Sequence, residues 1–421
     1  MKTAFYLGAA TAALIAGGAQ ADQITVAGPW LSPEQEVVRE IFDVFEERTG
    51  HEVSYVGSDS FEQQIVVDAE AGAAPNLAVF PQPGLAADLA SRGFLTPLKP
   101  DMSAWVKDNY AAGQSWVDLG SFADKNGDSQ HYGMFFRVDL KSLVWYSPEN
   151  FEDAGYEIPE SMEDLKALTE QMVADGVTPW CIGLGSGAAT GWPATDWVED
   201  LMLRTQSPAD YDAWVANDMK FNDPKVIEAI EEFGWFIQDA NVAGGTGAVA
   251  TTDFRDSPKG LFSSPPQCMM HRQASFIPAF FPEGTEVGVD ADFFYFPSYA
   301  DKDLGNPVLG AGTLFAITNE SDAAHELIAF LQEPIAHEIW MSKGGFLTPH
   351  KGVDTSKFVD DTSRKMNEIL LGATTFRFDG SDLMPGGVGA GSFWTGMVDY
   401  TGGKSAEEVT TEIQNSWDAL K

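Results

Sequence analysis

Tryptophans that stand near acidic, amide or basic side chains are the residues of this sequence best suited to bind a small molecule. The richest cluster contains Trp192, Asp196 and Trp197. An indole ring can stack on the apolar C–H face of a saturated ring, and carboxylate, amide and guanidinium groups form charge-assisted hydrogen bonds with hydroxyls. This mixture favours a neutral polyol as the ligand. The candidate ligand-binding residues are Trp30, Asp59, Gln82, Arg137, Asp139, Trp192, Asp196, Trp197, His271, Arg272 and Trp394.

Each aromatic candidate also has a structural explanation. Trp30 could pack within its domain, although a position after a predicted strand favours ligand stacking. Trp197 could belong to the core, because helical spacing continues through it. Trp192, after Thr190-Gly191, and Trp394, after a glycine-rich loop, are the better stacking candidates.

The polar candidates could instead satisfy the protein itself. Asp59, Gln82 and Asp196 could cap the helices that follow them. Ion pairs within the protein are the alternative for Arg137, Asp139 and Arg272.

No local motif indicates catalysis or metal binding. The sequence has no G-x-S-x-G, no H-E-x-x-H and no P-loop, and its six histidines lack the spacing of metal ligands. We therefore expect no catalytic residue, no metal and no cofactor. A secreted glycoside hydrolase stays an alternative, because counting carboxylates does not exclude a catalytic pair.

The sequence of the N-terminal third predicts the strands and helices that would position several of these candidates. Predicted strands at residues 23–27, 51–56 and 76–80 alternate with helices. One of these helices starts with a capping box at residues 32–35. This order predicts a mostly parallel sheet with helices on both faces, whose ligands bind where the strands end. Those strand ends are residues 28–30, 57–59 and 81–84.

The rest of the chain predicts a second region of the same class. A hairpin turns at Asn126-Gly127 and returns as a long strand over residues 131–146. A helix capped by Ser161 follows, and then a strand over residues 180–184. Further helices and strands lead to a mostly helical C-terminal third. A chain of 421 residues exceeds the usual size of one core, so two domains are expected.

The N-terminal segment indicates where the protein acts, and the net charge limits what it can bind. Residues 1–21 have a basic start, a short apolar run and an Ala-Gln-Ala site, which predicts a signal peptide cleaved after Ala21. No later segment is apolar enough to insert into a membrane. The net charge of -38 argues against nucleic acid, because phosphate binding needs clustered basic residues.

The only cysteines are Cys181 and Cys268. An even count in an oxidising compartment favours a disulfide, and two buried free thiols are the alternative.

A set of motifs stands in order along the chain, at residues 75–80, 89–97, 132–136, 143–146, 158–165, 392–394 and 406–417. Their order and spacing resemble the extracellular solute-binding proteins of carbohydrate ABC importers, the group that includes maltose-binding protein. The resemblance covers essentially the whole mature chain. The sequence departs from that pattern in having Phe135 where proline is usual, Ser147 for asparagine and Met162 for tryptophan. Residues 185–197 and 268–273 are similar to the alpha-glucoside-binding subgroup, which takes sucrose, maltose, trehalose or glucosylglycerol.

This resemblance implies an α/β fold of two lobes, each a mostly parallel sheet with helices on both faces, closing on a ligand between them. The first lobe would hold residues 22–136 and 316–373, and the second residues 137–315 and 374–421. The expected function is periplasmic sugar capture, as a monomer, for the membrane subunits of an ABC importer. The same fold binding a non-sugar solute such as a polyamine is the alternative.

Overall fold

The computed structural model describes residues 22–111, 113–372 and 374–420, and the predicted signal peptide lies outside these ranges. Its first strands pair in parallel, as predicted. β1 (Gln23–Gly28) lies between β2 (Glu52–Gly57) and β3 (Leu77–Phe80) in one sheet. The helices that follow these strands are α1 (Glu34–Thr49), α2 (Phe61–Glu70) and α3 (Pro83–Ser91). The carboxyl ends of β1, β2 and β3 therefore share one edge of the sheet.

Helix α1 shows how the sequence builds this lobe. Val38, Ile41 and Phe45 lie on one buried face, and Gly50 ends the helix with a left-handed φ of 80°. The predicted capping box is wrong. Pro33 occupies the N-cap position and no side chain caps the helix, because the helix begins one residue later than a Ser32 cap requires.

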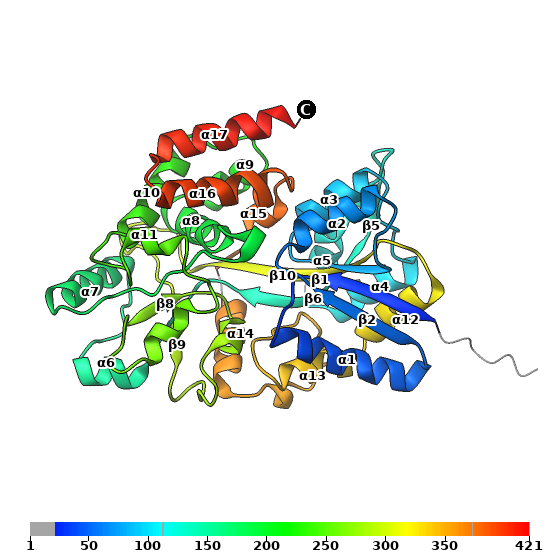
Figure 1. Ribbon diagram of the computed structural model, residues 1–421, viewed down its shortest axis with the longest axis horizontal. Coiled ribbons are helices and arrows are strands. Elements are labelled where there is room, and N and C mark those ends of the chain that lie inside the picture. The colour runs from blue at the N-terminus through cyan, green and yellow to red at the C-terminus, as the bar shows by residue number, and fades with distance from the viewer. Residues whose placement is uncertain (1–21, 112, 373, 421) are drawn as a thin grey trace, which may run out of the picture.

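Two fully buried antiparallel strands run from one lobe into the other (Figure 1). They are β6 (Gly133–Leu140) and β10 (Pro307–Ile317). β10 also pairs with β3 in antiparallel and with β11 (Thr375–Phe378) in parallel orientation. The register between β6 and β10 shifts between Thr313 and Leu314, which is a β-bulge.

The predicted long return strand over residues 131–146 is three strands instead. β5 (Ser129–His131) pairs with β4 (Ser121–Ala123) as the predicted hairpin, and β6 and β7 (Leu143–Tyr146) follow separately. The chain changes sheets after Leu140, because β6 pairs in the first sheet and β7 in the second.

The second lobe departs from the prediction in its sheet. β7 lies between β8 (Met270–Arg272) and β9 (Asp292–Tyr295) and is antiparallel to both, so the expected mostly parallel sheet is wrong for this lobe. The strand predicted at residues 180–184 is also not formed. Its backbone N–H groups donate to the separate segments around Asn241, Val249 and Met270 instead of forming one continuous ladder.

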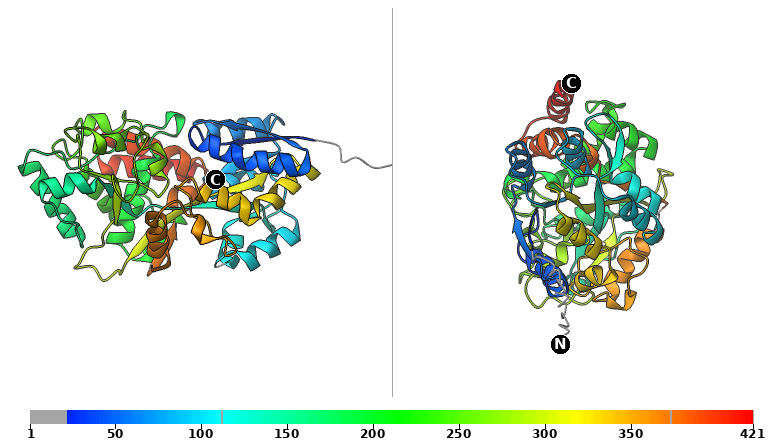
Figure 2. Two further views of the ribbon diagram at one scale, coloured as in Figure 1. Left: turned by 90° about the horizontal axis from the view of Figure 1, so that it is seen from below. Right: turned by 90° about the vertical axis from the view of Figure 1, so that its right-hand side faces the viewer.

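Helices cover both lobes, and Figure 2 shows the blue and green elements on opposite sides of the crossing strands. On the first lobe lie α4 (Pro100–Asn109), α5 (Gly113–Leu119), α12 (Asp322–Leu331) and α13 (Pro334–Met341). On the second lie α6 (Pro148–Ala154), α7 (Met162–Ala174), α8 (Trp192–Thr205), α9 (Pro208–Val215), α10 (Pro224–Phe236), α11 (Thr246–Val249), α15 (Gly380–Leu383), α16 (Trp394–Thr401) and α17 (Ala406–Ala419).

Helix α14 (Asp361–Gly372) approaches the second lobe, where Lys365 pairs with Asp292. The exact division of the chain into lobes therefore stays a prediction. Within the described ranges, no helix has both the length and the apolar character needed to cross a membrane.

Candidate functional site

A cleft between the lobes holds about 950 Å³ of space, counting the part open to solvent at its mouth. The strand ends that follow β1, β2 and β3 form its first-lobe wall. The starts of α8 and α16 and the loop before η2 (Ser257–Phe262) contribute to its second-lobe wall. Eight of the predicted ligand-binding residues line this cleft: Trp30, Asp59, Gln82, Arg137, Asp139, Trp192, Asp196 and Trp394.

Tryptophans come from both walls. Trp30 is only 2% exposed and packs edge-on against Trp340, with ring centroids 4.9 Å apart. Trp192 is half-buried at the first position of α8, and the ring of Phe254 meets it edge-on at 4.9 Å. Trp394 begins α16 and is also almost fully buried. Indole rings therefore border the cleft from both lobes.

Polar atoms in the cleft walls lack partners among the described residues. Buried polar groups in proteins are usually hydrogen-bonded. Apart from Arg137 Nε and Asp139 Oδ1, which lie 3.3 Å from each other, five such atoms have no hydrogen bond within the described part of the chain: Trp30 Nε1, Gln82 Oε1, Asp196 Oδ2, Thr313 Oγ1 and Trp394 Nε1. The indole groups donate, the carboxylate and amide oxygens accept, and the hydroxyl does both. A ligand with several hydroxyls matches this set, because each hydroxyl both donates and accepts.

Arg137 is held on the first-lobe side. Its guanidinium bonds Glu34 and lies 3.3 Å from Asp139 Oδ1, over the rings of Trp30 and Trp340. Burial raises the pKa of Glu34 and of Asp139, while Arg137 acts in the opposite direction on both. The ion pair that the sequence offered as the alternative for Arg137 is thus present, and the same residues still border the cleft.

Lys141 forms a second buried charge cluster. Its ammonium lies 2.8 Å from Asp196 Oδ1 and also bonds Asp379 Oδ2. Burial raises the pKa of Asp196 to about 7 against the opposing effect of Lys141. Burial acts upward on Asp379 as well, but Lys141 and hydrogen bonds lower that pKa to about 2. Lys141 therefore fixes Asp196 so that its other oxygen, Oδ2, is the one without a partner.

Asp196, Asp379 and Glu199 are close enough together to hold a metal ion. The donors do not favour one, because Lys141 already supplies the positive charge to two of them. Backbone N–H groups of Gly380 and Ser381 donate to the third, Glu199.

Glu62 is a buried carboxyl at the start of α2 that lines the cleft and has no ion pair within the described chain. Burial raises its pKa to about 7. Its side chain is within hydrogen-bonding reach of Gln82.

The capping alternatives are not what the structure shows. Gln82 occupies the N-cap position of α3 without capping it, Ser60 rather than Asp59 stands at the N-cap of α2, and Asp196 lies inside α8.

Three predicted residues do not line the cleft. Trp197 is 1% exposed and packs among Trp180 and Phe236 in the second-lobe core. Arg272 pairs with Asp200 at 2.6 Å, and His271 Nδ1 lies 2.8 Å from the carbonyl oxygen of Cys181. The structure thus places Trp197 in the core and Arg272 in an ion pair, which are the alternatives that the sequence offered for these two residues.

Several cleft residues were missed by the sequence analysis. Lys141 had a usable signal, because Arg137, Asp139 and Lys141 recur at every second residue, which is the spacing of side chains on one face of an extended segment. The others stand at helix starts, in short helices, in loops or beside the β-bulge of β10, where no sequence pattern singled them out. The missed residues include Glu34, Glu62, Lys141, Phe254, Arg255, Phe276, Phe280, Thr313, Ser381 and Asp382.

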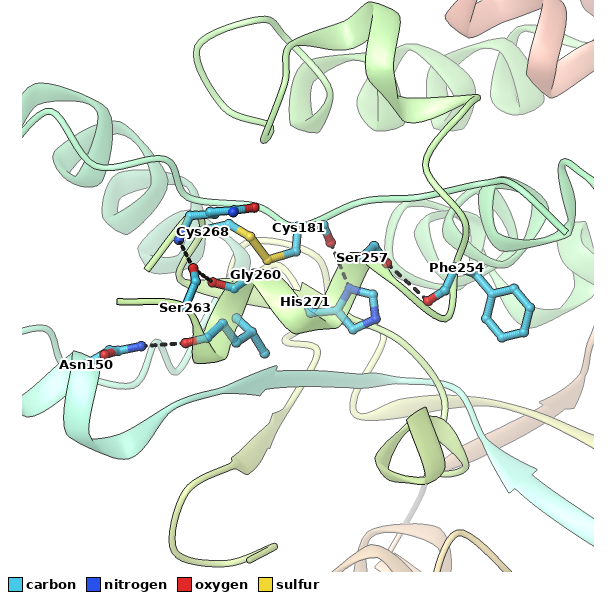
Figure 3. The surroundings of a disulfide bond; sticks show 10 residues. Asn150, Cys181, Phe254, Ser257, Gly260, Ser263, Cys268 and His271 are labelled. Atoms are coloured by element: carbon cyan, nitrogen blue, oxygen red, sulfur yellow. Dashed lines mark hydrogen bonds between the residues drawn. A yellow bond between two sulfur atoms is a disulfide. The ribbon is translucent and has the colours of Figure 1, made fainter. Parts of the chain in front are cut away.

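The predicted disulfide is confirmed. Cys181 and Cys268 are joined, with Cα atoms 5.4 Å apart and a separation of 87 positions in sequence, and both are buried (Figure 3).

Comparisons with known proteins agree with this geometry. Residues 30–338 match the profile described as bacterial extracellular solute-binding protein. The chain is 60% identical over 400 residues to the alpha-glucosides-binding periplasmic protein AglE of Rhizobium meliloti (strain 1021), covering 94% of this chain and 87% of AglE. It is 42% identical over 396 residues to the osmoprotective compounds-binding protein GgtB of Synechocystis sp. (strain ATCC 27184 / PCC 6803 / Kazusa), covering 94% and 92%.

Solved structures share the fold at low identity. The bacterial solute receptor AcbH, described as preferring b-D-galactopyranose, superposes with a TM-score of 0.81 at 17% identity, over 95% of this chain and 100% of AcbH. Maltose-bound MalE3 of T. maritima gives 0.74 at 15% identity, over 95% and 100%. The expected α/β fold of two lobes is confirmed.

Proposed function

Because the chain belongs to the bacterial extracellular solute-binding protein family, we propose that it captures an alpha-glucoside in the interlobe cleft and delivers it to an ABC importer. The 60% identity to AglE over nearly the whole chain carries this proposal. The family assignment also makes the protein a binding protein rather than an enzyme.

The cleft supports a sugar as the ligand. The half-buried indole ring of Trp192 offers apolar surface to a pyranose, and the buried rings of Trp30 and Trp394 border the same cleft. The unpartnered donors and acceptors around them suit hydroxyls. We assign ligand contact to the eight predicted residues that line the cleft, and not to Trp197, His271 or Arg272.

The charges of the cleft favour a neutral ligand. Each basic group at the wall already has a carboxylate partner: Arg137 with Glu34, Lys141 with Asp196, and Arg255 with Asp253. No unpaired cation among the described wall residues is therefore available for an anionic solute. A polyamine would instead neutralise Asp59, Glu62 and Asp382, and the experiment below includes it.

The family and its relatives place the protein outside the cytoplasmic membrane, in an extracellular or periplasmic location. We propose the finer points from the sequence: a periplasmic monomer, cleaved after Ala21, that docks on the membrane subunits of its importer.

Thermal unfolding of residues 22–421 tests the proposal against sucrose, maltose, trehalose, glucosylglycerol, glucose and spermidine. A ligand at 100 times its dissociation constant adds about 2.7 kcal/mol to stability, which raises the midpoint by a few degrees. A shift with one or two glucosides and none with spermidine is the expected result. A shift with spermidine alone would overturn the sugar assignment.

A further inference from the structure

The Cys181–Cys268 disulfide joins two segments of the second lobe, and Figure 3 shows its surroundings. Cys181 opens the segment that leads to Ser186 and on to Trp192, both of which line the cleft. Cys268 precedes β8. The disulfide therefore ties the segment that leads to Trp192 to the residues before β8.

The turn η2 rests directly on the disulfide. A Cβ atom added to Gly260 would lie only 2.5 Å from Cys268 Sγ and 3.1 Å from Cys181 Sγ. The backbone of η2 is thus in close contact with both sulfurs. Within this turn, Ser257 Oγ donates to the carbonyl oxygen of Phe254 at 3.2 Å, which ties η2 to the preceding residues (Figure 3).

The same loop is bonded to the segment that follows Cys181. Gly185 N donates to Thr252 O, and Phe254 N donates to Gly185 O, each at 2.9 Å. A Cβ atom on Gly183 would lie 2.6 Å from Thr252 O, so side chains larger than hydrogen would separate these two segments.

The tip of this loop reaches the cleft. Phe254 lines the cleft and meets the half-buried ring of Trp192 edge-on at 4.9 Å. Phe254 also packs against Phe280, and the guanidinium of Arg255 lies over its ring. Contacts therefore run without a gap from the disulfide through η2 and Phe254 to Trp192.

We infer that Cys181 and Cys268 are positioning residues for ligand binding: their disulfide holds the loop of residues 250–262 so that Phe254 fixes the ring of Trp192 in the cleft wall. This inference deepens the proposed function and rests on it for its ligand. It differs from a purely structural role, in which the disulfide only raises the free energy of unfolding.

Hydrogen exchange of the ligand-free protein gives the first test, which needs no sugar. Wild type is compared with the double variant Cys181→Ala/Cys268→Ala. We expect faster exchange in residues 250–262 and in residues 183–192 near Trp192, with unchanged exchange in the first lobe. Faster exchange confined to the residues next to the two alanines would overturn the inference.

Calorimetric titration gives the second test, with whichever of maltose, sucrose and trehalose binds the wild type most tightly. Loss of the disulfide should weaken binding roughly tenfold at 25 °C, about the effect of losing one ordered aromatic contact. Val226→Ala is the matched control, because Val226 is a buried core residue of α10 outside the cleft. It should lower the unfolding midpoint and leave the affinity unchanged.

A double-mutant cycle that combines the cysteine variant with Phe254→Ala tests whether the disulfide affects binding through Phe254. If the disulfide acts through Phe254, removing both must cost clearly less affinity than the two separate losses added together. An unchanged dissociation constant in the cysteine variant, or additive losses, would overturn the inference. If the wild type binds none of the sugars, the proposed function fails, and the exchange experiment still decides the positioning role.

Discussion

The first-lobe wall of the cleft comes largely from the ends of parallel strands, whereas the second-lobe wall comes from helix starts and loops held by buried charges and a disulfide. Trp30 and Gln82 stand two residues after the ends of β1 and β3, so the hydrogen-bonded sheet places them. Trp192 and Asp196 depend instead on Phe254 and Lys141, which come from distant parts of the chain. One wall is thus positioned by the backbone, and the other by side chains. Substitutions should separate the two.

Lys141→Met should have the largest effect, because it leaves the buried carboxylates of Asp196 and Asp379 without their cation. Removing one partner of a buried ion pair costs about 3–5 kcal/mol. Urea unfolding measures this loss. Adding Asp196→Asn to the variant should recover part of the stability. No recovery would show that Lys141 acts through packing rather than charge.

Trp30→Ala should cost stability, since Trp30 is a fully buried core residue in contact with Trp340. Large-to-small core changes of this kind cost about 3–5 kcal/mol. The urea midpoint of the sugar-free protein reports the loss. A variant as stable as wild type would contradict the view that the first-lobe wall is part of its core.

Trp192→Ala should instead cost affinity, because its half-buried ring faces the cleft. We expect binding of the best glucoside to weaken roughly 10- to 100-fold, with a stability change of about 1 kcal/mol or less. Calorimetric titration and urea unfolding on the same preparation separate the two quantities. Equal losses of stability in the Trp30 and Trp192 variants would remove the proposed difference between the walls.

Glu62→Gln should change the pH dependence of stability. Burial raises the pKa of Glu62 to about 7 from an ordinary value of 4.5, so the folded state binds this proton more tightly than the unfolded state. Its stabilising contribution is present below pH 4.5 and is lost as pH rises through 7. The variant should gain on wild type between pH 5 and 8, by up to about 3 kcal/mol.

Urea unfolding of the Glu62 variant and of wild type at pH 5 and at pH 8 tests this prediction. Glu170→Gln is the exposed control, and its stability relative to wild type should not change between the two pH values. A constant difference between the Glu62 variant and wild type across this range would contradict it.

The smallest expected effect concerns helix caps. Ser161→Ala should destabilise by about 1 kcal/mol, because the Ser161 hydroxyl accepts from Asp164 N at 3.1 Å. Ser32→Ala should change stability by less than about 0.5 kcal/mol, since Ser32 caps nothing. Thermal unfolding of both variants compares them, and equal losses would restore the capping box that the structure contradicts.

The first-lobe wall could be predicted because it follows from local regularity. Strand and helix periods locate β1, β2 and β3, and the parallel order places Trp30, Asp59 and Gln82 at one edge. The second lobe was harder. Trp192 and Trp197 belong to one helix. Helical spacing offered the core as an alternative for Trp197, but it did not decide that only Trp192 reaches the cleft.

The other features that the sequence did not predict depend on tertiary contacts. Phe254 and Asp382 stand in segments without periodicity, and only long-range contacts bring them to the cleft. Thr313 borders a β-bulge, which no residue pattern indicates. Residues 180–184 are apolar enough for a strand but bond three separate segments, so their pairing depends on where those segments fold.

Calorimetric titration of the mature protein with maltose, sucrose and trehalose, and with cellobiose as the β-linked counterpart of maltose, tests the central claim most directly. The account predicts that at least one alpha-glucoside binds at a single site and that cellobiose binds much more weakly. Binding of cellobiose as tight as that of the best alpha-glucoside, or of spermidine in the absence of any sugar binding, would contradict it.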